Sequence, residues 1–309
     1  MLSRVASHLY WLARYMERAE NMARILDVGQ TLALLAQSKD DTETALEPLI
    51  ITDHLKDFQA TGLVATTESV ARYLTWDPDQ PSSIANCLEA TRENARAVRG
   101  SITSEMWECI NDVWLQLQTK RRQGNDPINT EFYDWVKQCS HLFRGITFAT
   151  IRRDQPYHFI RLGTFIERAD NTARILSVKQ SAKHNGGQGD ESDYYSLSAV
   201  LRSVSALEAY RDTYKDSIDA RRVAELLVFH PTLPRSLRFC YDEIEQLLEH
   251  LPAGPSRLPR RWAAQMKARL TYGHVDEAYE LGLLDFLEGF LKENVGLGEA
   301  VQTAYLELK

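Results

Sequence analysis

A repeated segment constrains the fold of this chain more than any other feature of its sequence. Residues 8–30 and 158–180 are identical at twelve of 23 positions when they are aligned at a shift of 150. A second pair of segments, 74–87 and 227–240, aligns at a shift of 153 and shares a leucine, two prolines, a serine and a cysteine. Two blocks in the same order at nearly one shift indicate duplication of a unit of about 150 residues.

The duplication predicts two related halves, residues 1–153 and 154–309, that pack into one body about a pseudo-two-fold axis. Apolar residues recur at intervals of three and four, which is the spacing of helices, and the alternation typical of strands is nearly absent. Proline followed by serine at 81–83 and near 234–236 marks two helix starts. We therefore expect an all-α, multi-helix bundle. The predicted helices are 2–38, 82–100, 103–122, 129–150, 157–184, 193–212, 234–250, 258–271 and 276–307, with shorter ones near 44–58, 66–75 and 218–229.

Composition excludes several classes of protein. The chain has 309 residues, 44% of them hydrophobic and 26% charged, which is typical of a folded domain. A net charge of −7 disfavours nucleic acid as a partner, because phosphate binding needs a basic surface. No apolar run reaches the roughly 18 residues of a membrane span, and the first residues lack the apolar core of a signal peptide. Four scattered cysteines without a CxxC pair predict buried thiols and no zinc site. These features predict a cytoplasmic protein.

The first copy of the repeat carries a charged patch on an apolar helix. On a helical wheel Glu17, Asn21 and Arg24 fall on one line, between Tyr10 above them and Val28 below. A solvated face would continue polar, so this patch is expected to be buried or to line a cavity. The second copy has the same pattern. The predicted polar site consists of Glu17, Arg18, Glu20, Asn21, Arg24, Glu167, Arg168, Asp170, Asn171 and Arg174.

Three interpretations of this patch remain open. Because buried charge needs a partner, the patch can be a structural network that fixes the pairing of the two helices. It can also be a polar pocket that holds a charged ligand. A metal site built from its carboxylates is the third, although the Glu-x-x-His pairs of di-iron bundles are missing.

The spacing of the charges predicts how they pair. Glu20–Arg24 and Asp170–Arg174 lie four residues apart and can pair within one helix. An antiparallel crossing of the two helices would bring the glutamate of one copy to the arginine of the other.

A second group of charges follows Pro81. Arg92, Arg96 and Arg99 form a basic ridge on the predicted helix 82–100, and aligned guanidinium groups suit a carboxylate or phosphate. The alternative is a solvated face on which these arginines pair with neighbouring glutamates. The corresponding helix of the second half lacks the arginines.

No catalytic signature is found in the chain. The sequence has no P-loop, GxGxxG, GxSxG or HExxH motif, and no cofactor is expected. The segment 186–189, Gly-Gly-Gln-Gly, is typical of a linker.

Three segments together resemble a known family. They are MLSRVASHLYWLARYMERAENMARILDV, WDPDQPSSIANCLEATRENARAVRGSITSEMWE and FIRLGTFIERADNTARIL. They look like the bacterial Alpha-E family, which is named for an α-helical domain with a Glu-Arg motif. The resemblance runs from residue 1 to beyond 240 and implies that the two Glu-Arg copies are the centre of the protein.

The family is known mainly by the genes beside it, which encode ATP-grasp-type ligases and transglutaminase-like peptidases. The resemblance therefore implies an accessory protein that binds a substrate or peptide, such as an acidic small molecule or acidic peptide, during amide or peptide-bond formation. An enzyme that uses Glu17 or Glu167 as general acid or base, and a purely structural scaffold, are the alternatives.

Overall fold

The computed structural model describes residues 1–35, 41–122, 127–184, 190–252 and 256–307. Within these ranges the chain is helical and has no strand, so the predicted all-α class is confirmed there. The helices are α1 (Ser3–Leu35), α2 (Asp41–Ile51), α3 (Leu55–Ala60), α4 (Thr67–Trp76), α5 (Ile84–Ala97), α6 (Ser104–Arg122), α7 (Thr130–Thr150), α8 (Gln155–His184), α9 (Asp190–Ser203), α10 (Leu207–Tyr214), α11 (Ala220–Phe229), α12 (Leu237–His250), α13 (Leu258–Tyr272), α14 (Val275–Glu280) and α15 (Leu283–Val301).

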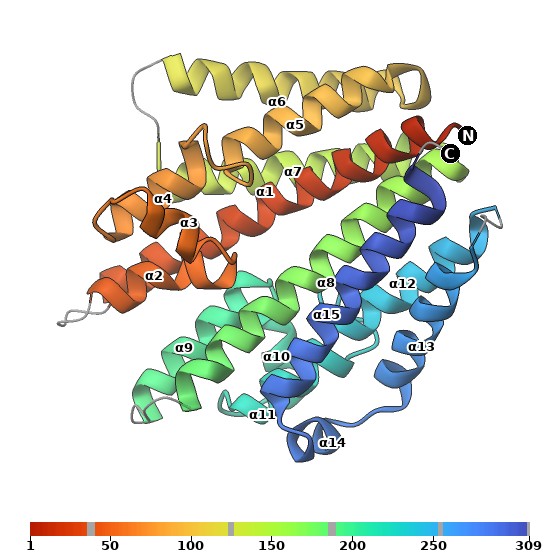
Figure 1. Ribbon diagram of the computed structural model, residues 1–309. Helices are drawn as coiled ribbons and strands as arrows, with labels where there is room; N and C mark the ends of the chain where they lie inside the picture. Colours follow the sequence, from red (N-terminus) through yellow and green to blue (C-terminus); the bar gives the residue numbers. More distant parts are fainter. Residues whose placement is uncertain (36–40, 123–126, 185–189, 253–255, 308–309) are drawn as a thin grey trace.

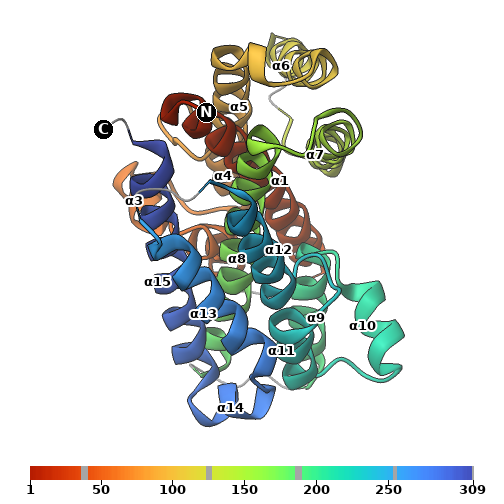
Figure 2. The same cartoon turned by 90° about the vertical axis from the view of Figure 1, so that its right-hand side faces the viewer.

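Two long helices, α1 and α8, form the centre of the molecule (Figure 1). Helices α5 and α7 pack on α1, and α12 and α15 pack on α8. Figure 2 shows α5, α6 and α7 at one end and α13, α14 and α15 along the other side. Because α1 and α8 carry the two copies of the motif, this arrangement places both copies in the middle of the core.

The central helices run in the same direction, so the antiparallel crossing considered above is wrong. The N-terminus of Met1 donates to the side chain of Gln155 at one end, and Ile25 lies close to Ile175 further along. The two helices approach each other closely at Gly163. A Cβ placed there would lie 2.4 Å from the carbonyl oxygen of Tyr10, so only glycine allows this contact.

Two of the predicted helix starts are confirmed. Ser83 is the N-cap of α5 and accepts a hydrogen bond from the amide of Asn86. Ser236 is the N-cap of α12 and accepts one from the amide of Phe239. The prolines that precede the two caps fix the direction in which the chain enters each helix.

Three of the predicted helices are broken in the structure. The segment 193–212 divides into α9 and α10 at Ser205, which has a φ of 52°. The segment 44–58 divides into α2 and α3 at Asp53, which has a φ of 61°. The segment 276–307 divides at Gly282, with a φ of 88°, and ends in a π-helical turn, Gln302–Leu306. Left-handed conformations at a serine and an aspartate have no strong sequence signal, which explains two of the three errors.

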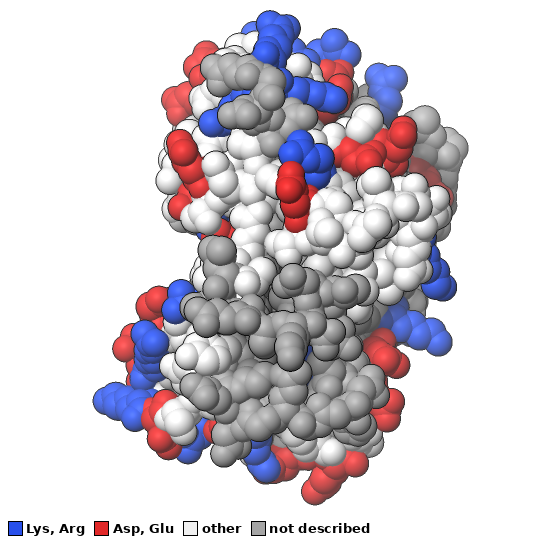
Figure 3. Space-filling model, turned by 90° about the vertical axis from the view of Figure 1, so that its left-hand side faces the viewer, with Lys and Arg blue, Asp and Glu red and all other residues white. Residues whose placement is uncertain are grey.

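The surface carries charges of both signs. On the face in Figure 3, lysine and arginine side chains alternate with aspartate and glutamate, with an uncharged area between them. None of the described helices is long and apolar enough to cross a bilayer. The predicted linker at 186–189 lies outside the described residues.

Candidate functional site

The Glu-Arg pairs of the two central helices bind each other. Arg168 donates from Nε and Nη2 to the two carboxylate oxygens of Glu17, at 2.9 and 3.0 Å. Arg18 donates in the same way to Glu167, at 2.6 and 3.0 Å. Such two-pronged pairs are stronger and more directional than single hydrogen bonds. The motif therefore joins α1 to α8 through two charge-assisted forks.

Small residues make this pairing possible. Ala19 and Ala23 on α1, and Ala169 and Ala173 on α8, are all fully buried. With Gly163 they let the two backbones come close enough for an arginine on one helix to reach a glutamate on the other. The alanines of the repeated motif thus have a packing role beside the charged residues.

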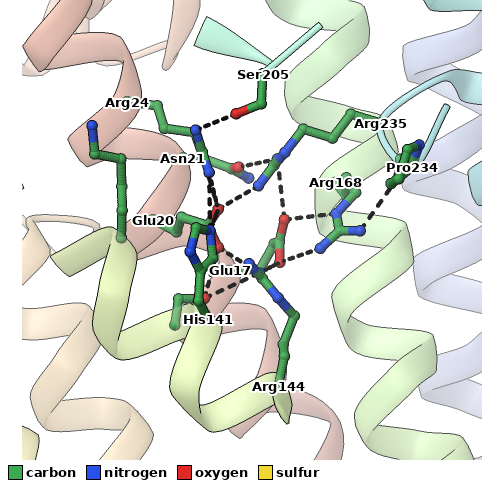
Figure 4. A network of polar contacts seen from close by, with 12 residues as sticks. Glu17, Glu20, Asn21, Arg24, His141, Arg144, Arg168, Ser205, Pro234 and Arg235 are labelled. Carbon is green, nitrogen blue, oxygen red and sulfur yellow. Dashed lines mark hydrogen bonds and ion pairs between the residues drawn. The ribbon is translucent and has the colours of Figure 1, made fainter. Parts of the chain in front are cut away.

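On one side of the pairing, four arginines from separate segments converge on two glutamates of α1 (Figure 4). We name this group the closed cluster. Its members are Glu17, Glu20, Asn21, Arg24, Ser140, Arg144, Arg168, Ser205 and Arg235.

Glu20 has the most partners in the closed cluster. Arg24 donates to it at 2.9 Å, Arg235 at 2.7 Å and the hydroxyl of Ser140 at 2.7 Å. Arg144 also donates to it. The side chain of Glu20 has no exposed surface, so these four donors replace its water. Arg24 further donates to the hydroxyl of Ser205 at 2.6 Å.

Glu17 is held in the same way. It accepts from Arg144 at 2.8 Å and lies 3.2 Å from Arg235, in addition to its fork with Arg168. Burial raises the pKa of Glu17, but the guanidinium groups of these three arginines together hold it below its ordinary value. The carboxylate is therefore ionised at neutral pH and has no proton to give.

On the other side of the pairing lies a second group, which we name the open cluster. Its members are Arg14, Arg18, Ser82, Glu167, Asp170, Asn171 and Arg174.

Glu167 and Asp170 are the acidic residues of the open cluster. Besides its fork with Arg18, Glu167 accepts from Arg14 Nε at 2.7 Å. Burial raises the pKa of Glu167, but Arg18 and Arg14 outweigh it and lower this pKa to about 2. Asp170 accepts from Arg174 at 2.7 Å, within one helix.

A cavity of about 240 Å³ opens beside this cluster. It is lined by motif residues of both central helices, by the turn 51–54 between α2 and α3, and by Ser82. One ordered water needs only about 10–15 Å³ measured in this way, so the space suits a larger molecule. At the closed cluster the side chain of Arg235 lies against Asn21 and Glu20.

Two amide groups at the pocket lack a hydrogen-bond partner. Asn21 and Asn171 both line it, and the Nδ2 atoms of both are buried without an acceptor. For Asn21 the assignment of oxygen and nitrogen is supported by its neighbour, because Oδ1 accepts from Arg235 at 2.8 Å. Both nitrogen atoms have almost no accessible surface, so they are unsatisfied groups within the pocket wall rather than donors exposed to a ligand.

The predicted arginine ridge does not join the motif. Arg92 donates to Asn111 and Glu93, and lies over the rings of Trp107 and Trp114 on α6. Arg96 pairs with Glu93, and Arg99 lies over Trp107. Arg92 and Arg96 therefore pair with a neighbouring glutamate, as in the alternative interpretation, whereas Arg99 contacts a tryptophan ring.

Three arginines of the two clusters were not among the predicted site residues. They are Arg14, Arg144 and Arg235. Arg144 is the sole charge among apolar neighbours on one stretch of α7, and Arg235 stands between a proline and an N-cap serine. Both positions carry a weak signal, because a charge among residues that are expected to be buried needs a partner.

The described residues contain no group of three or more histidine, cysteine, aspartate or glutamate side chains that is arranged to hold a metal ion. The carboxylates considered for a metal site are instead engaged by arginines. All four cysteines are buried and free, as predicted: Cys87, Cys109, Cys139 and Cys240.

Comparison with known proteins supports the resemblance noted from the motifs. A family model described as a predicted alpha-helical domain with a conserved ER motif matches residues 1–306. Uncharacterized proteins of Mycobacterium bovis and Mycobacterium tuberculosis are each 26% identical over 299 residues. The alignment covers 90% of this chain but 33% of theirs, so the chain spans about a third of the length of these relatives. No solved structure matches the chain.

Proposed function

Since the chain belongs to the Alpha-E family, we propose that it is a binding module that holds a carboxylate-bearing small molecule or peptide in the pocket between α1 and α8. In this proposal it works beside an ATP-grasp-type ligase, and a transglutaminase-like peptidase, in amide or peptide-bond formation. Because such a partner consumes ATP, the proposal also assigns the module to the cytoplasm.

The observation that carries the proposal is the set of free donors at the pocket. Arg18 and Arg174 line it with side chains that are 27% and 29% exposed, while Glu167 and Asp170 use only part of each guanidinium. A carboxylate that accepts from these groups would gain about 1.5–3 kcal/mol from each charge-assisted bond.

The charge of the two clusters also favours an acidic ligand. Their carboxylates are Glu17, Glu20, Glu167 and Asp170, and their guanidinium groups belong to Arg14, Arg18, Arg24, Arg144, Arg168, Arg174 and Arg235. Arginines thus outnumber carboxylates in a chain whose net charge is −7. An excess of buried cations attracts an anion even when the whole protein is acidic.

The proposed role beside a ligase rests on the genes that lie beside those of the family. The resemblance implies ligases and peptidases as partners. The mycobacterial relatives contain a segment like this chain within proteins about three times as long, which supports a module that works together with other protein segments.

Duplication accounts for the arrangement of the site, with residues 1–153 and 154–309 as the two halves about a pseudo-two-fold axis. Four pairs of features support this duplication. The first three are the reciprocal Glu-Arg forks, the caps Ser83 and Ser236, and the left-handed residues Asp53 and Ser205. The fourth pair is a backbone hydrogen bond across each left-handed turn, from His54 to Leu49 and from Ala206 to Leu201.

An enzyme with Glu17 or Glu167 as general acid or base is less well supported, because a carboxylate with a lowered pKa is also a weaker base. Arginines lower the pKa of both carboxylates, whereas a general acid needs a raised one. A pure scaffold accounts for the closed cluster but gives no reason for the pocket.

Calorimetry with L-glutamate and a glutamyl-glutamate dipeptide tests the binding role. We expect binding that Arg18→Ala or Arg174→Ala weakens at least tenfold, while Arg96→Ala, on the exposed ridge, leaves it unchanged. Co-purification from the native host tests the ligase partner. Absence of binding to both acids, together with failure to recover a ligase, would leave the scaffold.

A further inference from the structure

Arg235 of the closed cluster has no arginine as its counterpart in the open cluster. Arg235 directly precedes Ser236, the N-cap of α12. Its guanidinium donates to Asn21 Oδ1 at 2.8 Å and to Glu20 Oε1 at 2.7 Å. The side chain is 6% exposed, so this cation is enclosed by the cluster.

Ser82 has the position in the open cluster that Arg235 has in the closed cluster. It directly precedes Ser83, the N-cap of α5. Arg18 donates to its hydroxyl at 3.3 Å, as Arg168 donates to the carbonyl of Pro234, next to Arg235, at 3.4 Å. The two positions therefore face the motif from equivalent helix starts.

Ser82 itself lines the pocket, so a longer side chain at this position has space beside it. Asp170 and Asn171 line it, and they have the motif positions that Glu20 and Asn21 have in the closed cluster. Asp53, from the turn between α2 and α3, adds a further carboxylate at the same pocket.

From this comparison we infer that the pocket contains a cation subsite, in which Asp170 and Asn171 receive a guanidinium or ammonium group as Glu20 and Asn21 receive Arg235. The inference rests on the proposed function and narrows its ligand. With Arg18 and Arg174 available for a carboxylate, the ligand carries both an ammonium or guanidinium group and a carboxylate, as a free amino acid does.

The nearby Arg174 does not exclude a second cation. In the closed cluster Glu20 binds Arg24 and Arg235 at once, at 2.9 and 2.7 Å. Arg174 has the motif position of Arg24, and it engages Asp170 through Nε at 2.7 Å. A carboxylate has about four lone-pair positions, so Asp170 can accept a further donor.

A substitution that supplies the cation from the chain itself tests the subsite without any ligand. Ser82→Arg should fill the pocket as Arg235 fills its counterpart, and Ser82→Met is the matched control of similar length without charge. We expect Ser82→Arg to melt about 2–5 °C above Ser82→Met and to lose glutamate binding. A melting temperature at or below that of Ser82→Met would overturn the inference.

A second measurement decides the case if Ser82→Arg does not fold. Glutarate is glutamate without its ammonium group, so the pair isolates the cation. We expect L-glutamate to bind at least tenfold more tightly than glutarate, and Asp170→Asn to remove most of that difference. Equal binding of both acids would overturn the cation subsite and leave the proposed function intact. Binding of neither acid, with Ser82→Arg still stabilised, would overturn the proposed function and keep the subsite.

Discussion

The closed and open clusters are built from the same Glu-Arg-Ala-(Glu/Asp)-Asn motif, but their neighbours differ. At the closed cluster α7 supplies Arg144 and the start of α12 supplies Arg235, so both glutamates are surrounded by donors. At the open cluster Arg14 adds one donor, and Ser82 supplies only an uncharged hydroxyl that accepts from Arg18. The motif alone therefore does not determine whether its charged side chains are fully paired within the protein or partly exposed at a pocket. The residues that approach from other helices decide between the two roles.

The largest expected difference between the clusters concerns their acidic residues. Glu17→Ala leaves the buried Arg168 without its carboxylate and removes one of the two carboxylates that Arg144 and Arg235 each face. Removing one partner of a buried pair typically lowers the free energy of unfolding by about 3–5 kcal/mol. Denaturant unfolding of the purified variant measures this loss.

Asp170→Ala is the matched control, since Asp170 is partly exposed at the pocket and pairs with Arg174. We expect a loss of about 1 kcal/mol, on the scale of exposed pairs. Equal losses for the two variants would contradict the distinction between closed and open clusters.

Acid should weaken the pairing between the helices by about 3 kcal/mol through Glu167. Its pKa falls from 4.5 to about 2 on folding, so its stabilisation is complete above about pH 5. The stabilisation is lost as the pH falls through 4.5 towards 2, because the unfolded chain binds the proton first.

Unfolding curves of the wild type and Glu167→Gln between pH 7 and pH 2 test this expectation. The two should differ most at neutral pH and converge in acid. A difference that stays constant across this range would show that Glu167 is not stabilised as a carboxylate.

Arg24 and Arg174 compare the clusters at the same motif position. Arg24 is 10% exposed and binds Glu20, Ser205 and His141, whereas Arg174 is 29% exposed and binds Asp170. Arg24→Ala should lower the free energy of unfolding by about 2–3 kcal/mol, and Arg174→Ala by about 1 kcal/mol or less. Thermal and denaturant unfolding measure both, and the reverse order would contradict the comparison.

The smallest effect is expected on the ridge that follows Pro81. Arg96 is 66% exposed and pairs with Glu93 three residues away. Arg96→Ala should change the free energy of unfolding by about 0.5 kcal/mol or less. A loss of glutamate binding in this variant would show that the ridge takes part in ligand binding.

Helical periodicity and the interrupted apolar stripe were sufficient to predict the class of fold and the position of the motif in the core. Glu17, Asn21 and Arg24 are buried because apolar residues precede and follow them on the same face. The direction of α8 relative to α1 was not predictable, because nothing within either helix encodes it. Arg144 and Arg235 were missed for a similar reason: each reaches Glu17 or Glu20 from more than 100 residues away, through packing that local patterns do not specify.

Gly163 places no side chain between the backbones of the two central helices. A methyl group there would begin 2.4 Å from the carbonyl oxygen of Tyr10, about 1 Å inside ordinary contact, and would force the backbones apart. That position is one helical turn from Glu167, so the displacement would lengthen both arginine forks together and widen the mouth of the pocket. The absence of a Cβ at this one position thereby sets the distance between the two helices, and with it the geometry of the whole site.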